Sequence, residues 1–174
     1  MNIQDCKNEQ SDTPLNLTIE AENKYPGAVM LARTLLADRA SLEPIRKYLI
    51  RKEQLGSEQV DHAITEYVKY LVMIGATNMG IAPSEEADSV WHAHILHAHI
   101  YEPFCRRHFG RFIHHVPSDP DAHADERVLQ SQNELGKLFF GKNTIYCSHH
   151  GCNNHHSCFG HGCRPGMCSS GPSH

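Results

Sequence analysis

Residues 57–75 read SEQVDHAITEYVKYLVMIG, and they carry the clearest structural signal in the chain. Their apolar residues recur every three or four positions, which is the spacing that places side chains on one face of an α-helix. We therefore expect a long helix that begins at Ser57 and packs this face against a core. The residues of the expected face are Val60, Ile64, Tyr67, Val68, Leu71 and Val72.

Shorter apolar patterns lie on both sides of this helix. Towards the N-terminus they predict a helix from Pro26 to about Arg39 and a second one that Ser41 caps and Gly56 ends. A loop is expected over residues 75–83.

Beyond that loop, Ser84 is suited to cap a helix whose first turn carries acidic residues. Pro103 should interrupt this helix, and Gly110 should end it. A last amphipathic helix is expected over residues 125–140, and no segment shows the two-residue period of a strand. The fold class is therefore all-α, a small bundle of about five or six helices.

The chain divides into three parts by composition. Residues 1–20 are polar without a period and are expected to form a loose N-terminal arm. Residues 21–142 form the helical domain, and residues 143–174 form a Cys/His-rich tail in which Gly, Asn, Ser and Pro disfavour a packed structure. We expect that tail to be disordered.

Composition narrows the classes of function. The formal net charge is -4 without a long basic run, so a nucleic-acid partner is not expected. The sequence contains no stretch of about 18 apolar residues, so we expect no membrane span. It also shows no export signal, which favours a reducing cytoplasm, where clustered cysteines more often bind metals than form disulfides.

The chain is rich in histidine, which is the commonest metal-ligand side chain in proteins. Histidine supplies 15 of its 174 residues, and eight of these lie between residues 92 and 123. Asp88 and His92 are four apart, so on a helix the carboxylate can orient the imidazole while the other ring nitrogen binds a metal. His94 points about 200° away from His92, so on a straight helix the two are poor co-ligands.

The metal ligands expected in the helical domain are His92 with His114 or His115, and His94 and Cys105 are further candidates. Asp88 and Tyr101 are expected to support them by hydrogen bonding. Only one of two adjacent histidines in an extended segment can easily point inward. The alternative is a purely structural role, in which these side chains pack in the core and form hydrogen bonds with each other.

The segment from about residue 66 to residue 117 resembles the glycine-rich domain-containing protein-like family. The resemblance supports a histidine site in this segment, and the family has no activity that carries over. Pro103 departs from the family pattern, and His97, His99 and His108 fall between its positions. The residues that carry the resemblance are Asp88, Trp91, His92, His94, Leu96, Tyr101, Cys105, Phe109, Gly110, His114, His115 and Pro117.

The tail forms a second candidate metal site, because thiolates beside imidazoles suit zinc or Cu(I). Its cysteines do not follow the Cys-x2-Cys spacing of common zinc modules. A substrate for enzymatic modification and an inert tail are the alternatives. The residues concerned are Cys147, His149, His150, Cys152, His155, His156, Cys158, His161, Cys163 and Cys168.

The sequence thus predicts a protein that binds a transition metal, with zinc expected first and copper or iron as alternatives. Redundant ligands favour buffering, delivery or sensing of the metal. A metalloenzyme and an interaction module with a protein partner remain alternatives, and whether the chain is an enzyme stays open. The sequence contains no nucleophile elbow, phosphate loop, dinucleotide fingerprint or HExxH motif.

Overall fold

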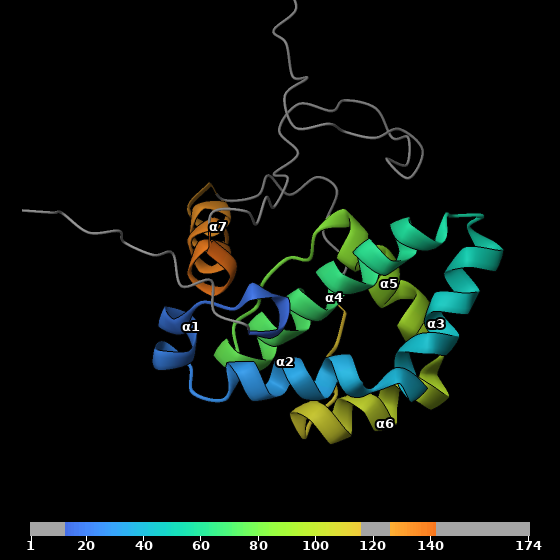
Figure 1. Cartoon of the computed structure of the whole chain (residues 1–174), viewed down its shortest axis with the longest axis horizontal. Coiled ribbons are helices and arrows are strands. Elements are labelled where there is room, and N and C mark those ends of the chain that lie inside the picture. The colour runs from blue at the N-terminus through green and yellow to red at the C-terminus, as the bar shows by residue number, and fades with distance from the viewer. Residues whose placement is uncertain (1–12, 116–125, 142–174) are drawn as a thin grey trace, which may run out of the picture.

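A computed structural model describes residues 13–115 and 126–141, and side chains of the last helix from residue 130 onward. Over these residues the fold is all-α, as predicted, with seven α-helices, one short 3-10 helix and no strand (Figure 1). The predicted disorder of residues 143–174 lies outside the described residues.

The N-terminal segment differs from the loose arm expected over residues 1–20. From Thr13 onward it contains the 3-10 helix η1 (Pro14–Asn16) and the start of α1 (Ile19–Lys24). Thr18 caps α1 by accepting a hydrogen bond from the backbone of Ala21. Its backbone N–H also donates to the carbonyl of Phe139, 2.9 Å away in the last helix. The arm prediction is therefore wrong from Thr13, because these backbone groups find partners on a distant helix.

The next two helices are α2 (Ala28–Ala37) and α3 (Arg39–Lys52). The predicted cap at Ser41 is wrong, because the side chain of Asp38, three residues earlier, caps α3. Asp38 accepts from the backbone N–H of Ser41, 3.2 Å away, and so satisfies one of the free donors in the first turn.

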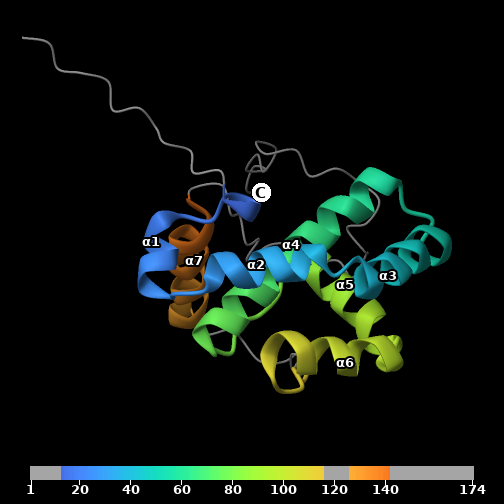
Figure 2. The ribbon, with the colours of Figure 1, turned by 60° about the horizontal axis from the view of Figure 1, so that its bottom comes forward.

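Helix α4 (Ser57–Thr77) is the centre of the bundle. It contacts α2, α3, α5 and α7, and Figures 1 and 2 show it running through the middle of the molecule. The helix continues through Gly75, where we had expected a loop, and ends at Asn78 in a left-handed conformation. Of the six residues of its predicted face, only Ile64 is not fully buried.

Helices α5 (Glu85–Leu96) and α6 (Ala98–Phe109) are separated at His97. We had expected the interruption at Pro103, but that proline lies inside α6. The backbone N–H of His97 donates to the carbonyl of His94, and its carbonyl accepts from Tyr101. His97 thus ends one helix and begins the next, so the change of direction precedes the proline.

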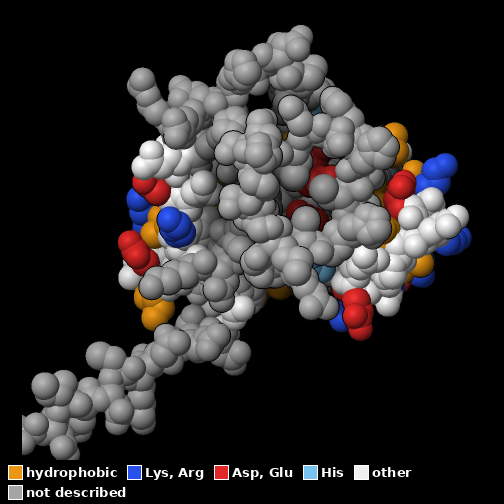
Figure 3. Space-filling view, turned by 90° about the horizontal axis from the view of Figure 1, so that it is seen from above, with side chains coloured by type: hydrophobic (Ala, Val, Ile, Leu, Met, Phe, Trp, Pro, Cys, Tyr) orange, Lys and Arg blue, Asp and Glu red, His pale blue; other side chains and the backbone are white. Residues whose placement is uncertain are grey.

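Helix α7 (Glu126–Phe140) packs beside α1 at one end of the bundle, and α3 lies at the other end (Figures 1 and 2). The ring of Phe139 stacks on Tyr25, with 5.3 Å between centroids. On the face shown in Figure 3, the basic and acidic side chains are intermixed. None of the described helices has the length and apolar character needed to cross a bilayer.

Candidate metal centre

Asp88, His92 and His115 form a cluster at one side of α5. His92 Nδ1 lies 3.4 Å from Asp88 Oδ2, and His115 Nε2 lies 2.8 Å from Asp88 Oδ1. The two imidazole rings are 4.4 Å apart between centroids. One potential ligand atom from each residue lies within 4.8 Å of the others, and within the described ranges this is the one such group of three.

These distances match the requirements of a small divalent metal ion. Zinc bonds of about 2.0–2.1 Å in tetrahedral geometry place neighbouring donor atoms about 3.4 Å apart. The separation of 3.4 Å between His92 and Asp88 equals this value, and the hydrogen bond of 2.8 Å between His115 and Asp88 is shorter. Side-chain rotations that widen this hydrogen bond and bring the two imidazoles together would place all three donors around one ion. The sequence predicted that Asp88 would orient His92, whereas its position between both imidazoles also suits direct ligation.

The position of His115 depends on the segment that follows α6. That helix ends at Gly110, whose φ of +67° is readily adopted by glycine. The chain then returns along α5, and the Tyr101 hydroxyl holds it by donating to the carbonyl of Ile113, 2.6 Å away. The Trp91 indole donates to the same hydroxyl at 2.7 Å and lies 4.7 Å from the His115 ring.

The cluster faces an open cleft of about 730 Å³. The cleft lies between the loop after α4, the outer side of α5 and the returning segment 111–115. The His92 side chain is 56% exposed and that of Asp88 35%, whereas that of His115 is only 14% exposed. A metal held by these side chains would therefore keep a side open to solvent or to a ligand.

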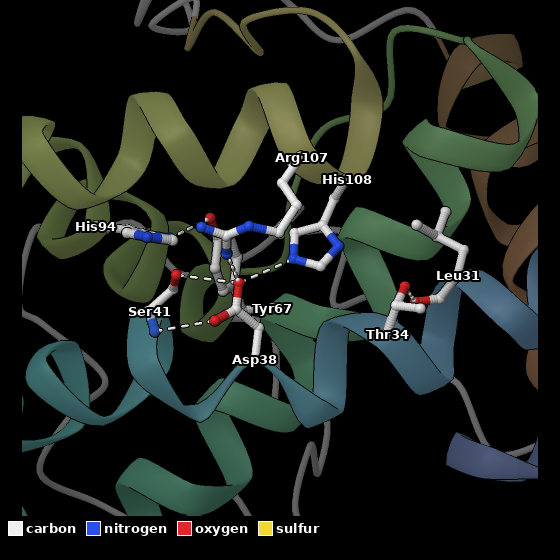
Figure 4. Close-up of polar contacts among 8 residues, drawn as sticks. All are labelled: Leu31, Thr34, Asp38, Ser41, Tyr67, His94, Arg107 and His108. Atoms are coloured by element: carbon white, nitrogen blue, oxygen red, sulfur yellow. Dashed lines mark hydrogen bonds and ion pairs between the residues drawn. The ribbon is translucent and has the colours of Figure 1, made fainter.

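His94 does not belong to this cluster, although the sequence named it as a candidate ligand. It is fully buried, and its Nδ1 lies 3.1 Å from the hydroxyl of Tyr67 (Figure 4). Desolvation lowers the pKa of His94 to about 4, with a further contribution from His97. His94 lies two positions after His92 on the same helix, so the helical period directs its side chain away from that of His92 and into the core.

Cys105, Tyr101 and His114 also have surroundings that differ from those of metal ligands. Cys105 is fully buried, and burial raises the pKa of its thiol, which disfavours the thiolate that binds metals. The Tyr101 hydroxyl accepts from the Trp91 indole and donates to the Ile113 carbonyl, so it supports the segment that carries His115 and not His92 directly. His114 is exposed at the cleft, where its ring lies 4.8 Å from Phe112, so of the two histidines it is His115 that approaches Asp88.

A second polar cluster, which the sequence analysis missed, joins the α2–α3 junction to the end of α6 (Figure 4). Asp38 accepts hydrogen bonds from His108 Nε2 at 2.9 Å, from the Ser41 hydroxyl at 3.1 Å and from Arg107. Burial raises the pKa of Asp38, but the hydrogen bonds from His108 and Ser41 outweigh it and hold the pKa below its ordinary value. In the sequence, the position of Asp38 immediately before α3 could have indicated its role as a helix cap.

A third feature is a shallow groove of about 920 Å³ along α3. Four of its lining side chains are basic and one, Glu43, is acidic. Its aromatic side is formed by Tyr48, whose ring lies edge-on to His97 at 5.0 Å. The basic residues are Arg39, Lys47, Arg51 and Lys52.

The ten tail residues that the sequence named as metal or thiol sites, from Cys147 to Cys168, lie outside the described residues. Their metal binding therefore stays a prediction.

A protein-family model with the description UCP032817-like matches residues 32–153, more than two thirds of the chain. The chain belongs to the UCP032817-like family. Neither the curated proteins nor the solved structures contain a significant match to it. The family description names no activity, so the function has to be argued from the site.

This assignment corrects the resemblance to the glycine-rich domain-containing protein-like family, which is wrong. That resemblance rested on a motif within about 50 residues, whereas the family match covers residues 32–153. Several residues of the motif, among them Trp91, Tyr101 and Cys105, are buried in the core. Helix packing alone can produce such a pattern of aromatic and small residues, so these positions of the motif do not identify a family.

Proposed function

We propose that this protein binds a transition-metal ion through Asp88, His92 and His115. The observation that carries the proposal is the convergence of three donor atoms within 4.8 Å of one another on two segments far apart in sequence. Two imidazoles and one carboxylate are the ligand types that zinc takes in open sites. Zinc is the first candidate, and copper and iron also accept imidazole ligands.

The solvent exposure of the three proposed ligands indicates which role a bound metal could have. Closed structural zinc sites use four protein ligands, whereas exchangeable and catalytic sites leave a position free. His92 is more than half exposed, so a bound ion can be reached and removed from the cleft side. This accessibility favours buffering, delivery or sensing of the metal.

A metalloenzyme is the second candidate. It is favoured by the cleft of about 730 Å³ onto which the cluster opens, because such clefts hold small molecules in many proteins. An ion with a free position could activate water or polarise a bound ligand there. Turnover of a substrate by the metal-loaded protein, lost in the ligand variants, would distinguish this role from storage.

Trp91 makes the site measurable in the full chain. It is the chain's single tryptophan, and its ring lies 4.7 Å from that of His115. A paramagnetic ion such as Co²⁺ bound at the cluster should therefore quench the tryptophan fluorescence. Co²⁺ bound to tail thiolates would also produce a charge-transfer absorption that an imidazole–carboxylate site lacks, so the two kinds of site are separable.

The experiment is a Co²⁺ titration of the full chain and of a variant with His92→Ala and His115→Ala. We expect saturable quenching in the parent and its loss in the variant. His99→Ala, an exposed histidine outside the cluster, should behave like the parent, and so should His114→Ala. Equal quenching in the parent and the double variant, with both shown to be folded by circular dichroism, would contradict the proposed centre.

A further inference from the structure

Arg111 brings a positive charge to the cleft that holds the proposed metal centre. It follows Gly110 directly and lines the same cleft as Asp88, His92 and His115. Its guanidinium donates a hydrogen bond to the side-chain carbonyl of Asn78, the residue that ends α4. This bond anchors the arginine at the edge of the cleft without neutralising it.

Arg111 and His115 belong to the same returning segment, and both line the cleft. Arg111 lies at the bend that follows Gly110. Ile113 is buried, and His115 is turned towards α5. Phe112 and His114 between them are exposed.

The charges around the cleft favour an anionic ligand. With a divalent ion in place, the two charges of the ion and the charge of Arg111 exceed those of the two carboxylates that line the cleft, Asp88 and Glu85. The sum of these charges leaves one positive charge in the cleft. Among the described residues, no carboxylate forms an ion pair with Arg111, so its remaining N–H donors can serve a ligand oxygen.

The cleft is also lined by apolar side chains. Ile74 and Ile81 are almost fully buried beneath it, and Met79, half exposed, stands at its edge. The indole of Trp91 adds an aromatic surface beside the cluster. A ligand that fills this cleft would therefore present an anionic group to the metal and Arg111 and a hydrocarbon portion to these side chains.

We propose that the cleft binds an organic monocarboxylate with an apolar body, whose carboxylate coordinates the metal ion and accepts hydrogen bonds from Arg111. This inference rests on the proposed metal centre and adds a ligand class to it. A monocarboxylate fits better than inorganic phosphate, because phosphate offers no hydrocarbon to contact the half-exposed side chain of Met79 and the other apolar residues that line the cleft.

The test uses the full chain loaded with Co²⁺ and titrated with hexanoate, acetate, hexanol and inorganic phosphate. Direct coordination changes the visible absorption of Co²⁺, so the binding is read at the metal itself. We expect a saturable change with hexanoate, a weaker response to acetate and phosphate, and none with hexanol. The variant with His92→Ala and His115→Ala should give no hexanoate response, which excludes binding at metal held by the tail.

Two matched variants test the role of Arg111. Arg111→Gln should weaken hexanoate binding roughly tenfold or more, the effect of losing a charge-assisted hydrogen bond, without weakening Co²⁺ binding. Arg106→Gln removes the same charge from an exposed residue of α6 outside the cleft and should leave hexanoate binding unchanged.

The outcomes separate this inference from the proposed function. If Co²⁺ binds at the cluster but hexanoate leaves its spectrum unchanged, the ligand class is wrong and the metal centre stands. A stronger response to phosphate than to hexanoate would also overturn the ligand class. Equal hexanoate binding by the parent and Arg111→Gln would overturn the role of the arginine. If Co²⁺ fails to bind at the cluster, the metal centre itself is refuted.

Discussion

The hydroxyl of Tyr101 donates a hydrogen bond to the backbone carbonyl of Ile113, 2.6 Å away, and thereby holds the segment that carries His115. The same hydroxyl accepts from the Trp91 indole, so one buried side chain connects α6, α5 and the returning segment. The proposed metal ligands lie around this connection, and the Tyr101 hydroxyl supports them through the segment it holds.

Replacing Tyr101 with phenylalanine tests whether this connection positions the site. We expect the change to lower the free energy of unfolding by about 1–3 kcal/mol, because the buried indole N–H loses its acceptor. Co²⁺ affinity, measured by Trp91 fluorescence, should also fall by about tenfold, since a loosened segment holds His115 less firmly. Tyr48→Phe, in a residue outside the cleft, should leave Co²⁺ affinity unchanged. An unaltered affinity in Tyr101→Phe would show that the hydroxyl does not position the ligand.

Replacing Asp88 with asparagine tests the carboxylate between the two imidazoles. The neutral amide keeps the shape but loses the charge, so we expect metal affinity to fall at least about 10- to 100-fold. The melting temperature without metal should change little, because the Asp88 side chain is partly exposed. Glu86→Gln removes the same charge from an exposed position two residues earlier and serves as the control. Similar affinities for the two variants would argue against a role for Asp88.

The burial of His94 predicts that stability depends on pH. Its pKa of about 4 in the folded protein lies below the ordinary value of 6.5, so the unfolded chain binds the proton more readily. The stabilising contribution is therefore present above pH 6.5 and is lost as the pH falls towards 4, by roughly 3 kcal/mol in total. Urea unfolding at a series of pH values measures this slope.

A double variant isolates the histidine in that experiment. His94→Leu combined with Tyr67→Phe removes both members of the buried pair, whose facing atoms are 3.1 Å apart, and leaves no new unpaired polar group between them. Its stability should depend less steeply on pH between 6.5 and 4. An unchanged slope would assign the acid sensitivity to other groups.

Gly75 lies where α4 passes close to α2 and α6, and it should not tolerate a side chain. A Cβ atom there would come within 2.7 Å of Leu31 Cδ2 and 2.8 Å of Phe109 Cε1. Gly75→Ala should therefore destabilise the protein by about 1–2 kcal/mol despite the better helix propensity of alanine. Gly80→Ala, with open space around its Cβ, should change stability by less than about 0.5 kcal/mol. Equal melting temperatures for the two variants would contradict this reading.

Asp38 should contribute far more to stability than an exposed carboxylate in an ion pair. Asp38→Ala removes the cap of α3 and the acceptor for His108, which should cost about 2–4 kcal/mol. Asp61→Ala breaks the exposed pair with Arg46 and should cost much less. Because the pKa of Asp38 is lowered, its contribution is present above pH 3.8 and is lost as the pH falls through the lowered pKa. The free energies of unfolding of both variants can be measured with a denaturant. Equal values would show that the Asp38 cluster does not stabilise the fold.

Much of the fold could be predicted from the sequence because helical periodicity is a local property. The buried face of α4 follows from the three- and four-residue spacing of its apolar side chains, and so does the shared face of Asp88 and His92. The opposite direction of His94 follows from the same period. Helix ends were predicted less well, because Asp38 and His97 act as caps through backbone and side-chain contacts that the apolar pattern does not encode.

By itself, the sequence determined an all-α domain and placed a carboxylate and an imidazole one helical turn apart. Only the tertiary structure decided that His115, and not His114, approaches Asp88, and that Arg111 shares their cleft. The physical reason is that these contacts join segments more than 20 residues apart. Their meeting depends on the turn at Gly110 and on the hydrogen bond from Tyr101 to Ile113, whose partners are brought together by helix packing and not by local spacing.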